Sequence, residues 1–295
     1  MGRIPRRQGA QKLLFPAMRR LDRERGPLDA HADILELVLR DFVLRANENP
    51  DGPRAYVAAL KKKHPGIDAN FSPPEQVRSN AARWSLVQTH VVAREFFKKF
   101  ARDYRWLRKP QSWRSKRGNE TLDPLEVIVE NIPRDISIAI KNSINYLIVG
   151  YYRSIRNELI HLDAPSAIGQ WREILLRRLE FEKAFPGMEL PGEPAEIRHQ
   201  DCRIYTRAVS RLANELNDRC ELTPEEIATA WIDDEAFIAQ CLHYRSTRKT
   251  LARHLRRCFD KEFGNAAAGF EKISELVWEH MEIIPNKAIR KRERR

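Results

Sequence analysis

Apolar residues recur along most of this chain at intervals of three and four positions, the spacing of amphipathic helices. The clearest case predicts a long helix over about 75–107. One apolar stripe of this helix is formed by Leu86, Ala93, Phe97, Phe100, Tyr104 and Leu107. A second apolar face is formed by Trp84, Val87 and Val91. We therefore expect this helix to be central and buried on two sides.

The same spacing predicts helices along the rest of the chain. They are expected at about 29–63 (interrupted by NPDGP at 49–53), 134–163, 166–184, 196–218, 223–232, 234–260 and 266–283. Asp29 is a candidate cap for the first, and Gly150 is a candidate kink in the second. TPEEI at 223–227 combines a threonine N-cap, a proline at the first helical position and acidic residues in the first turn. The fold class predicted is all-α.

Proline- and glycine-rich segments divide the pattern into three parts. FPGMELPGEP at 185–194 is the strongest break. We predict an N-terminal helical extension with a basic tail (1–75), a central helical bundle (76–184) and a C-terminal helical domain with a basic tail (185–295).

Composition places the chain among globular proteins, with 42% hydrophobic and 32% charged residues over 295 positions. No apolar run reaches the 18 or so residues of a membrane span, and the N-terminus lacks the apolar segment of a secretory signal. The four cysteines, Cys202, Cys220, Cys241 and Cys258, form no CxxC pair and are expected in the core. We expect a cytoplasmic protein with no membrane contact, metal or cofactor.

The net charge of +12 is concentrated in blocks. Residues 94–117 hold ten Lys/Arg against two acids, interleaved with aromatic side chains that could stack on unpaired bases. The candidate nucleic-acid contacts are Lys98, Arg102 and Arg105 here, with Arg245, Lys249 and Arg253 along a predicted helix at 243–257. The alternative is that the aromatics are core residues and the basic residues form solvated faces.

RNELIH at 156–161 lies late on the predicted helix 134–163. The core face of this segment is expected to be Ile148, Tyr152, Ile155, Leu159 and Leu162. Arg156, Asn157 and His161 then point away from the core, with Asn157 and His161 side by side. Arg156 lies about 140° around an ideal helix from His161, so two facing copies of the chain would bring the pair together better than one.

Arginine and histidine together suit attack on a phosphodiester. A histidine can take a proton from a ribose 2′-hydroxyl or give one to the leaving 5′-oxygen. A guanidinium can hold the phosphate oxygens and stabilise the charge that develops on them. Two histidines, one from each protomer, would supply both base and acid without a metal.

RNELIH resembles the R-x4–6-H motif, often R-N-x-x-x-H, of the HEPN superfamily of all-α RNases. The order of a long helix, a variable loop, the motif helix and a closing helix is similar too, over about residues 76–184. For the family this implies a dimerising helical bundle with a composite cleft for metal-independent RNA cleavage. Arg156, Asn157 and His161 match the motif. His90 or Glu95 would be the polar residue that the family often places on the preceding long helix. For His90, the residues alone favour a hydrogen-bonded core histidine.

These observations predict a metal-independent endoribonuclease that leaves a 2′,3′-cyclic phosphate. The resemblance implies a toxin or antiphage (abortive-infection) effector with RNA as substrate, a homodimeric site and possibly an antitoxin or defence-system partner protein. The alternative is a non-catalytic helical nucleic-acid-binding or adaptor protein. No phosphate-binding glycine loop, HExxH or GxSxG motif offers a competing chemistry.

Overall fold

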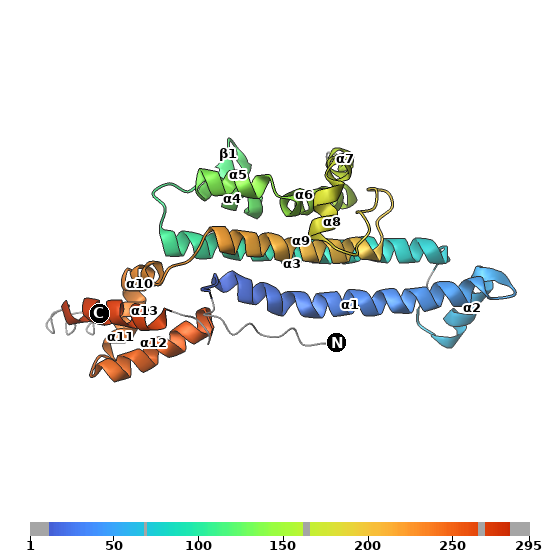
Figure 1. Ribbon diagram of the computed structural model, residues 1–295. Helices are drawn as coiled ribbons and strands as arrows, with labels where there is room; N and C mark the ends of the chain where they lie inside the picture. The colour runs from blue at the N-terminus through green and yellow to red at the C-terminus, as the bar shows by residue number, and fades with distance from the viewer. Residues whose placement is uncertain (1–11, 68–69, 162–165, 265–268, 284–295) are drawn as a thin grey trace. The chain divides into compact units, whose positions relative to one another are not determined.

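The computed structural model describes residues 12–67, 70–161, 166–264 and 269–283. Within these ranges the chain forms thirteen helices and one pair of very short strands (Figure 1), which confirms the all-α class. The strands, β1 (Lys116–Arg117) and β2 (Glu120–Thr121), pair antiparallel around Gly118. Gly118 adopts φ 60°, a conformation that glycine reaches at little cost.

The helices are α1 (Pro16–Asn47), α2 (Gly52–Lys63), α3 (Pro74–Arg108), α4 (Pro124–Asn131), α5 (Arg134–Lys141), α6 (Ile144–Ile160), α7 (Ile168–Leu176), α8 (Arg178–Ala184), α9 (His199–Arg219), α10 (Pro224–Ile232), α11 (Glu235–Leu242), α12 (Arg248–Glu262) and α13 (Phe270–Ile283). Helix α3 follows the predicted range closely. The predicted start of α10 is confirmed as a capping box, in which the Thr223 hydroxyl accepts from Glu226 N and the Glu226 carboxylate accepts from Thr223 N.

Several predicted helices have different ends. Helix α1 begins at Pro16, so Asp29 lies inside it and is not its cap. The segment predicted as one helix over 134–163 is broken before Ser143, whose hydroxyl accepts from Tyr146 N and caps α6. Gly150 lies within α6 and is not where the helix breaks. The segments 166–184 and 234–260 are likewise each divided into two helices.

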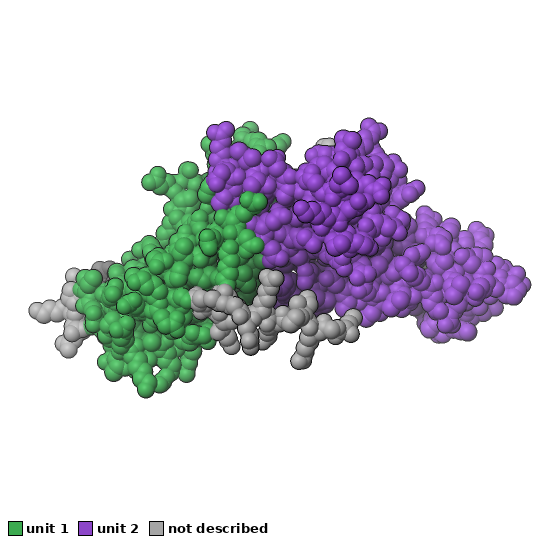
Figure 2. Space-filling model, in the orientation of Figure 1, with its two compact units in different colours: residues 1–20, 97–133, 216–295 green, residues 21–96, 134–215 purple. Residues whose placement is uncertain are grey.

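The chain forms two compact units, each assembled from separate stretches of sequence (Figure 2). Unit 1 consists of residues 1–20, 97–133 and 216–295, and unit 2 of residues 21–96 and 134–215. The chain passes from one unit to the other at four points: three lie within the long helices α1, α3 and α9, and the fourth lies at 133/134, just before α5. The expected division at 75/76 and 184/185 coincides with none of these points and stays a prediction.

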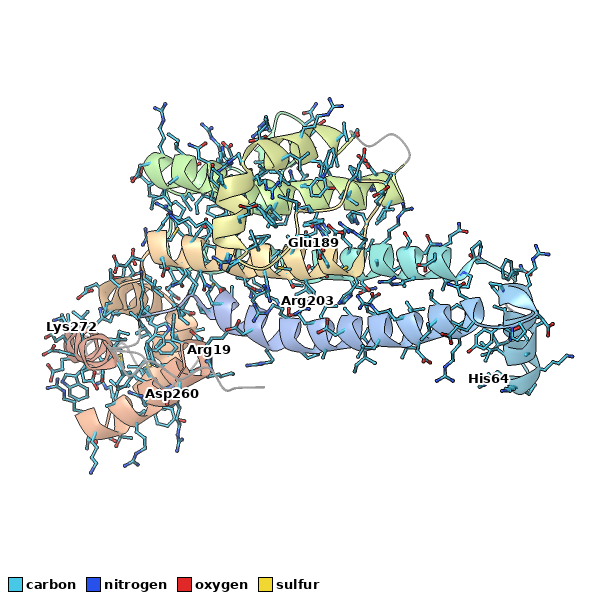
Figure 3. All side chains as sticks on the ribbon, turned by 45° about the vertical axis from the view of Figure 1, so that its right-hand side comes forward. Arg19, His64, Glu189, Arg203, Asp260 and Lys272 are labelled. Carbon is cyan, nitrogen blue, oxygen red and sulfur yellow. The ribbon has the colours of Figure 1, made fainter. Side chains whose placement is uncertain are left out.

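The core of unit 1 is rich in aromatic residues. Phe15 packs on Phe100 with ring centroids 4.6 Å apart. Trp231 of α10 contacts Phe237 and Phe259. The N-terminal part of α1 also contacts α12: the Arg19 guanidinium donates to the main-chain carbonyl of Asp260 at 3.0 Å, and Figure 3 labels both residues.

In unit 2, α1 runs antiparallel to α9. Arg25 donates to the Ser210 hydroxyl, and eight residues further along α1 the Asp33 carboxylate contacts His199 Nε2 at 3.0 Å. Helix α3 packs along α9 on another side, where the Cys202 thiol lies 3.3 Å from the Ala82 carbonyl. The three helices form a platform within unit 2.

Helix α6 is fastened to this platform through a buried carboxylate. Asp201 of α9 accepts hydrogen bonds from Tyr152 Oη at 2.8 Å, from Gly192 N at 2.9 Å and from Arg198 N at 2.9 Å. Tyr151 of α6 donates to the Gly192 carbonyl. The proline-rich segment 185–194 is therefore held against α6 and α9 within unit 2.

Three of the cysteines, Cys202, Cys220 and Cys241, are buried and Cys258 is partly buried. Burial raises the pKa of Cys220 to about 11 and that of Cys241 to about 12, as expected of core thiols. No helix in the described part of the chain combines the length and apolarity that a membrane crossing requires.

Candidate functional site

The RNELIH segment occupies the last turn of α6 and the residue that follows it. The helix ends at Ile160, and His161 is its C-cap, with an extended backbone at φ −123° and ψ 119°. Arg156 and Asn157 are partly buried, whereas His161 is exposed. The imidazole thus stands at the end of a rigid helix, open to solvent.

Asn157 connects the other two motif residues. Its side-chain Oδ1 accepts from Arg156 Nη1 at 3.0 Å. Its main-chain carbonyl accepts from His161 N at 2.7 Å. One residue therefore fixes both the arginine head group and the backbone from which the histidine projects.

The guanidinium of Arg156 is incompletely satisfied. Its Nε is buried and has no hydrogen-bond partner among the described residues. A buried donor without a partner costs free energy, of the order of 1–3 kcal/mol, unless water or a ligand meets it. Arg156 is thus oriented by Asn157 and keeps one buried N–H, at Nε, without a partner among the described residues.

Two expectations about this segment are wrong. Leu159 was expected on the core face but its side chain is 38% exposed, whereas Ile148, Tyr152 and Ile155 are buried as predicted. Because the helix ends at Ile160, the direction of His161 is set by its extended backbone. The angle of about 140° between Arg156 and His161 on an ideal helix therefore does not apply. Leu162, and Asp163 beyond it, lie outside the described residues.

Glu158, which no sequence pattern singles out, has a structural role inside the motif. Its carboxylate accepts from the backbone N of Ala167, at the start of α7. Gln170 lies in the first turn of α7, and its Nε2 is close to Gly150 of α6. Its Oε1 is buried and has no partner among the described residues. No sequence signal singles out Gln170, because its burial depends on how α7 packs on α6.

His90 is a buried residue of the unit 2 core. Its Nδ1 lies 2.9 Å from the Tyr205 hydroxyl, and Tyr205 in turn packs on Tyr152 of α6 with ring centroids 5.1 Å apart. His90 is therefore a hydrogen-bonded core histidine. It contacts α6 indirectly, through the Tyr205 ring that packs on Tyr152. Glu95 is partly exposed on α3.

Most of the aromatic residues of 94–117 belong to the core. Phe96, Phe97, Phe100 and Tyr104 are buried, which confirms the core alternative for these four, whereas Trp106 and Trp113 are partly exposed. The second apolar face of α3 was expected to be buried, and this prediction is wrong: Trp84 is 67% exposed and Val91 is 51% exposed. Amphipathic spacing identifies apolar faces but does not say which of them another element covers.

The basic candidates of α3 remain accessible. Lys98, Arg102 and Arg105 are exposed and follow one another at spacings of four and three, on one side of the helix. The Arg105 guanidinium lies 5.6 Å from the Trp113 ring centroid. These three cations form a row suited to phosphate contacts.

The second basic set is less regular than expected. Arg245 lies in the turn between α11 and α12, whereas the other two candidates, Lys249 and Arg253, are exposed on α12 itself. The predicted continuous helix 243–257 is wrong because Thr247 caps a new helix, accepting from Thr250 N at 3.1 Å. The basic tail at 285–295 lies outside the described residues.

All six nucleic-acid candidates belong to unit 1, and the RNELIH residues belong to unit 2. No group of three or more His, Cys, Asp or Glu side chains within the described ranges has the geometry of a metal site. Comparison with protein-family models, curated proteins and solved structures finds no match to the chain.

Proposed function

We propose that this protein is a metal-independent endoribonuclease whose reacting groups are Arg156 and His161, positioned by Asn157. The observation that supports it is that Asn157 orients the Arg156 guanidinium in the last turn of α6, and that His161 is exposed at the end of the same helix. The guanidinium would stabilise charge on the phosphate, and the imidazole would move the proton of the attacking 2′-hydroxyl.

The proposed site is shared between two copies of the chain. Cleavage needs a base that removes the proton of the 2′-hydroxyl and an acid that protonates the leaving 5′-oxygen, and one motif offers one histidine. A second copy supplies the other, in the manner of the HEPN RNases that RNELIH resembles. A role as a toxin or antiphage effector in the cytoplasm, with an antitoxin or defence-system partner, belongs to the same proposal.

The test uses purified protein with end-labelled single-stranded RNA in excess EDTA. Cleavage that leaves a 2′,3′-cyclic phosphate supports the nuclease. The matched control is His243→Ala, because His243 is also an exposed C-cap histidine, at the end of α11. Cleavage that survives His161→Ala as fully as His243→Ala would show that RNELIH is only a helix surface. A viability assay in the producing cell covers a nuclease that is silent in vitro.

One observation favours a second function. Lys98, Arg102 and Arg105 form an exposed cationic row on α3, so binding of nucleic acid without cleavage is the alternative. Tight binding that weakens steeply with salt, in the absence of any cleavage or toxicity, would support this adaptor-type role.

A further inference from the structure

A cavity of about 530 Å³ lies within unit 2, away from the RNELIH residues. It is lined by Glu75, Arg78, Ser79 and Ala82 of α3 and by Ala195, Glu196, Ile197, Arg198 and His199 at the start of α9. Its volume is in the range of sites that hold small molecules. The lining combines Arg78, Arg198 and His199 with two carboxylates, Glu75 and Glu196, and with a short apolar floor.

Arg78 is held in place by a carboxylate behind it. Its Nε and Nη2 donate to the buried Glu36 of α1, at 3.1 Å and 2.6 Å. Its remaining nitrogen, Nη1, has only a long contact of 3.8 Å to the exposed Glu75. A guanidinium has two bidentate edges, and Glu36 occupies one of them. The other edge can therefore receive a second anion.

His199 is oriented in the same way. Its Nε2 contacts Asp33 of α1 at 3.0 Å, and its side chain is largely buried. Asp33 and Glu36 lie three residues apart, so one face of α1 supports both basic groups from behind. Burial opposes ionisation of Glu36, but hydrogen bonds from Arg78 and Arg40 keep its pKa below the ordinary value. The carboxylate that holds Arg78 is therefore charged at neutral pH.

Arg198 provides a second guanidinium, from the rim. Its guanidinium is more than half exposed and lies 3.4 Å from Glu189, which Figure 3 labels in the segment before α9. An exposed pair of this kind is weak and easily exchanged for another anion. Ser79 adds a hydroxyl to the lining. Donors thus reach the cavity from two helices and from its rim.

We infer that this cavity binds a small phosphomonoester, with its phosphate held by Arg78 and Arg198. A phosphate has three terminal oxygens and accepts from donors on several sides, which a planar carboxylate does less well. The cavity volume leaves room for a small organic group on the ester oxygen, next to Ala82 and Ile197. The inference does not depend on the proposed nuclease, since no RNELIH residue lines the cavity.

The experiment is calorimetric titration of the full-length protein with ribose 5-phosphate, inorganic phosphate and ribose. Ribose 5-phosphate is expected to bind most tightly, phosphate more weakly and ribose not at all. Phosphate binding as tight as the ester would overturn the claim of an ester site, and no binding of either at millimolar concentration would overturn the anion site itself.

Variants locate the binding. Arg198→Ala, an exposed change, is expected to weaken ribose 5-phosphate binding by about 10–100-fold, the worth of a charge-assisted hydrogen bond. Arg78→Lys keeps one charge but loses the second bidentate edge, and a loss of about tenfold is expected. The matched control is Arg178→Ala, which removes an exposed arginine paired with Glu182 elsewhere in unit 2. Equal affinities in Arg198→Ala, Arg78→Lys and the control, with circular dichroism showing all three folded, would overturn the inference.

Discussion

The middle and the end of α6 belong to one helix but differ in what their side chains contact. In the middle, Tyr152 and Ile155 are almost completely buried, and the Tyr152 hydroxyl donates to the buried Asp201. At the end, His161 is exposed and Arg156 keeps a donor without a partner in the described residues. The polar groups of the first set are bonded within the fold, whereas the second set contains an exposed imidazole and a guanidinium N–H without a partner in the described residues.

This difference separates stability from chemistry along a single element. A middle that is satisfied and packed gives the helix one position, and a rigid helix end can then hold reacting groups in one geometry. Changes in the middle should therefore lower the free energy of unfolding, while changes at the end should lower the rate. Each prediction below tests that division.

His161→Ala should have the largest effect. Loss of the proton-transfer group is expected to reduce RNA cleavage about 10²–10⁴-fold. The free energy of unfolding should change by less than about 1 kcal/mol, because the side chain is exposed. Cleavage rates and urea denaturation of His161→Ala and the His243→Ala control provide the measurement. A large loss of stability in His161→Ala would place this residue with the middle of the helix.

Ile155→Ala and Leu159→Ala are four residues apart and should differ sharply. Ile155 is 1% exposed, so its truncation is expected to destabilise the protein by about 2–5 kcal/mol. Leu159 is partly exposed, and its loss should cost less than about 1 kcal/mol. Denaturation midpoints compare the two directly. Equal costs would mean that Leu159 is covered in the folded protein, as a second copy of the chain across the motif would do.

The sequence pattern predicts the features of the structure that depend on residues close together in the chain. The ends of α3 and the capping box at Thr223 follow from residues within a few positions of each other. The motif positions Arg156, Asn157 and His161 were also visible, because their side chains share a short segment.

The rest depends on contacts between distant parts of the chain. Ile34 and Val38 have the spacing of a core stripe in α1, yet both are exposed, because spacing does not reveal which face meets a partner. Asp201 gives no sequence signal of its own. Its importance comes from Tyr152, 49 residues earlier, and from Gly192 in a loop.

Asp201→Asn should break the fastening of α6 without touching the motif. The carboxylate accepts three hydrogen bonds, and the amide would place an NH₂ group where one acceptor oxygen stood. A loss of about 1–3 kcal/mol is expected. Cleavage per folded molecule should be unchanged, so a rate that falls further than the folded fraction would contradict the division along α6.

The pH dependence of that loss has a defined sign. Burial raises the pKa of Asp201 above its ordinary value of 3.8, so the folded protein holds this proton more tightly than the unfolded chain does. The stability that this provides is fully present below pH 3.8 and is lost as the pH rises through the folded pKa. Asparagine has no such proton. The stability deficit of Asp201→Asn should therefore be largest at acid pH and narrow as the pH rises, and a deficit that widens would contradict the raised pKa.

Tyr152→Phe should have the smallest effect, and it is the closest test of the boundary within α6. The change removes one hydroxyl and keeps the ring that packs on Tyr205, so only the 2.8 Å bond to Asp201 is lost. Gly192 N still donates to the same carboxylate oxygen, which limits the cost to about 0.5–1.5 kcal/mol. Tyr151→Phe is the matched control, since that neighbouring hydroxyl bonds the Gly192 carbonyl instead. Both variants should cleave RNA at the wild-type rate per folded molecule. If Tyr152→Phe alone lowered that rate tenfold at unchanged stability, the buried middle of α6 would be part of the site, and the separation of stability from chemistry along this helix would be wrong.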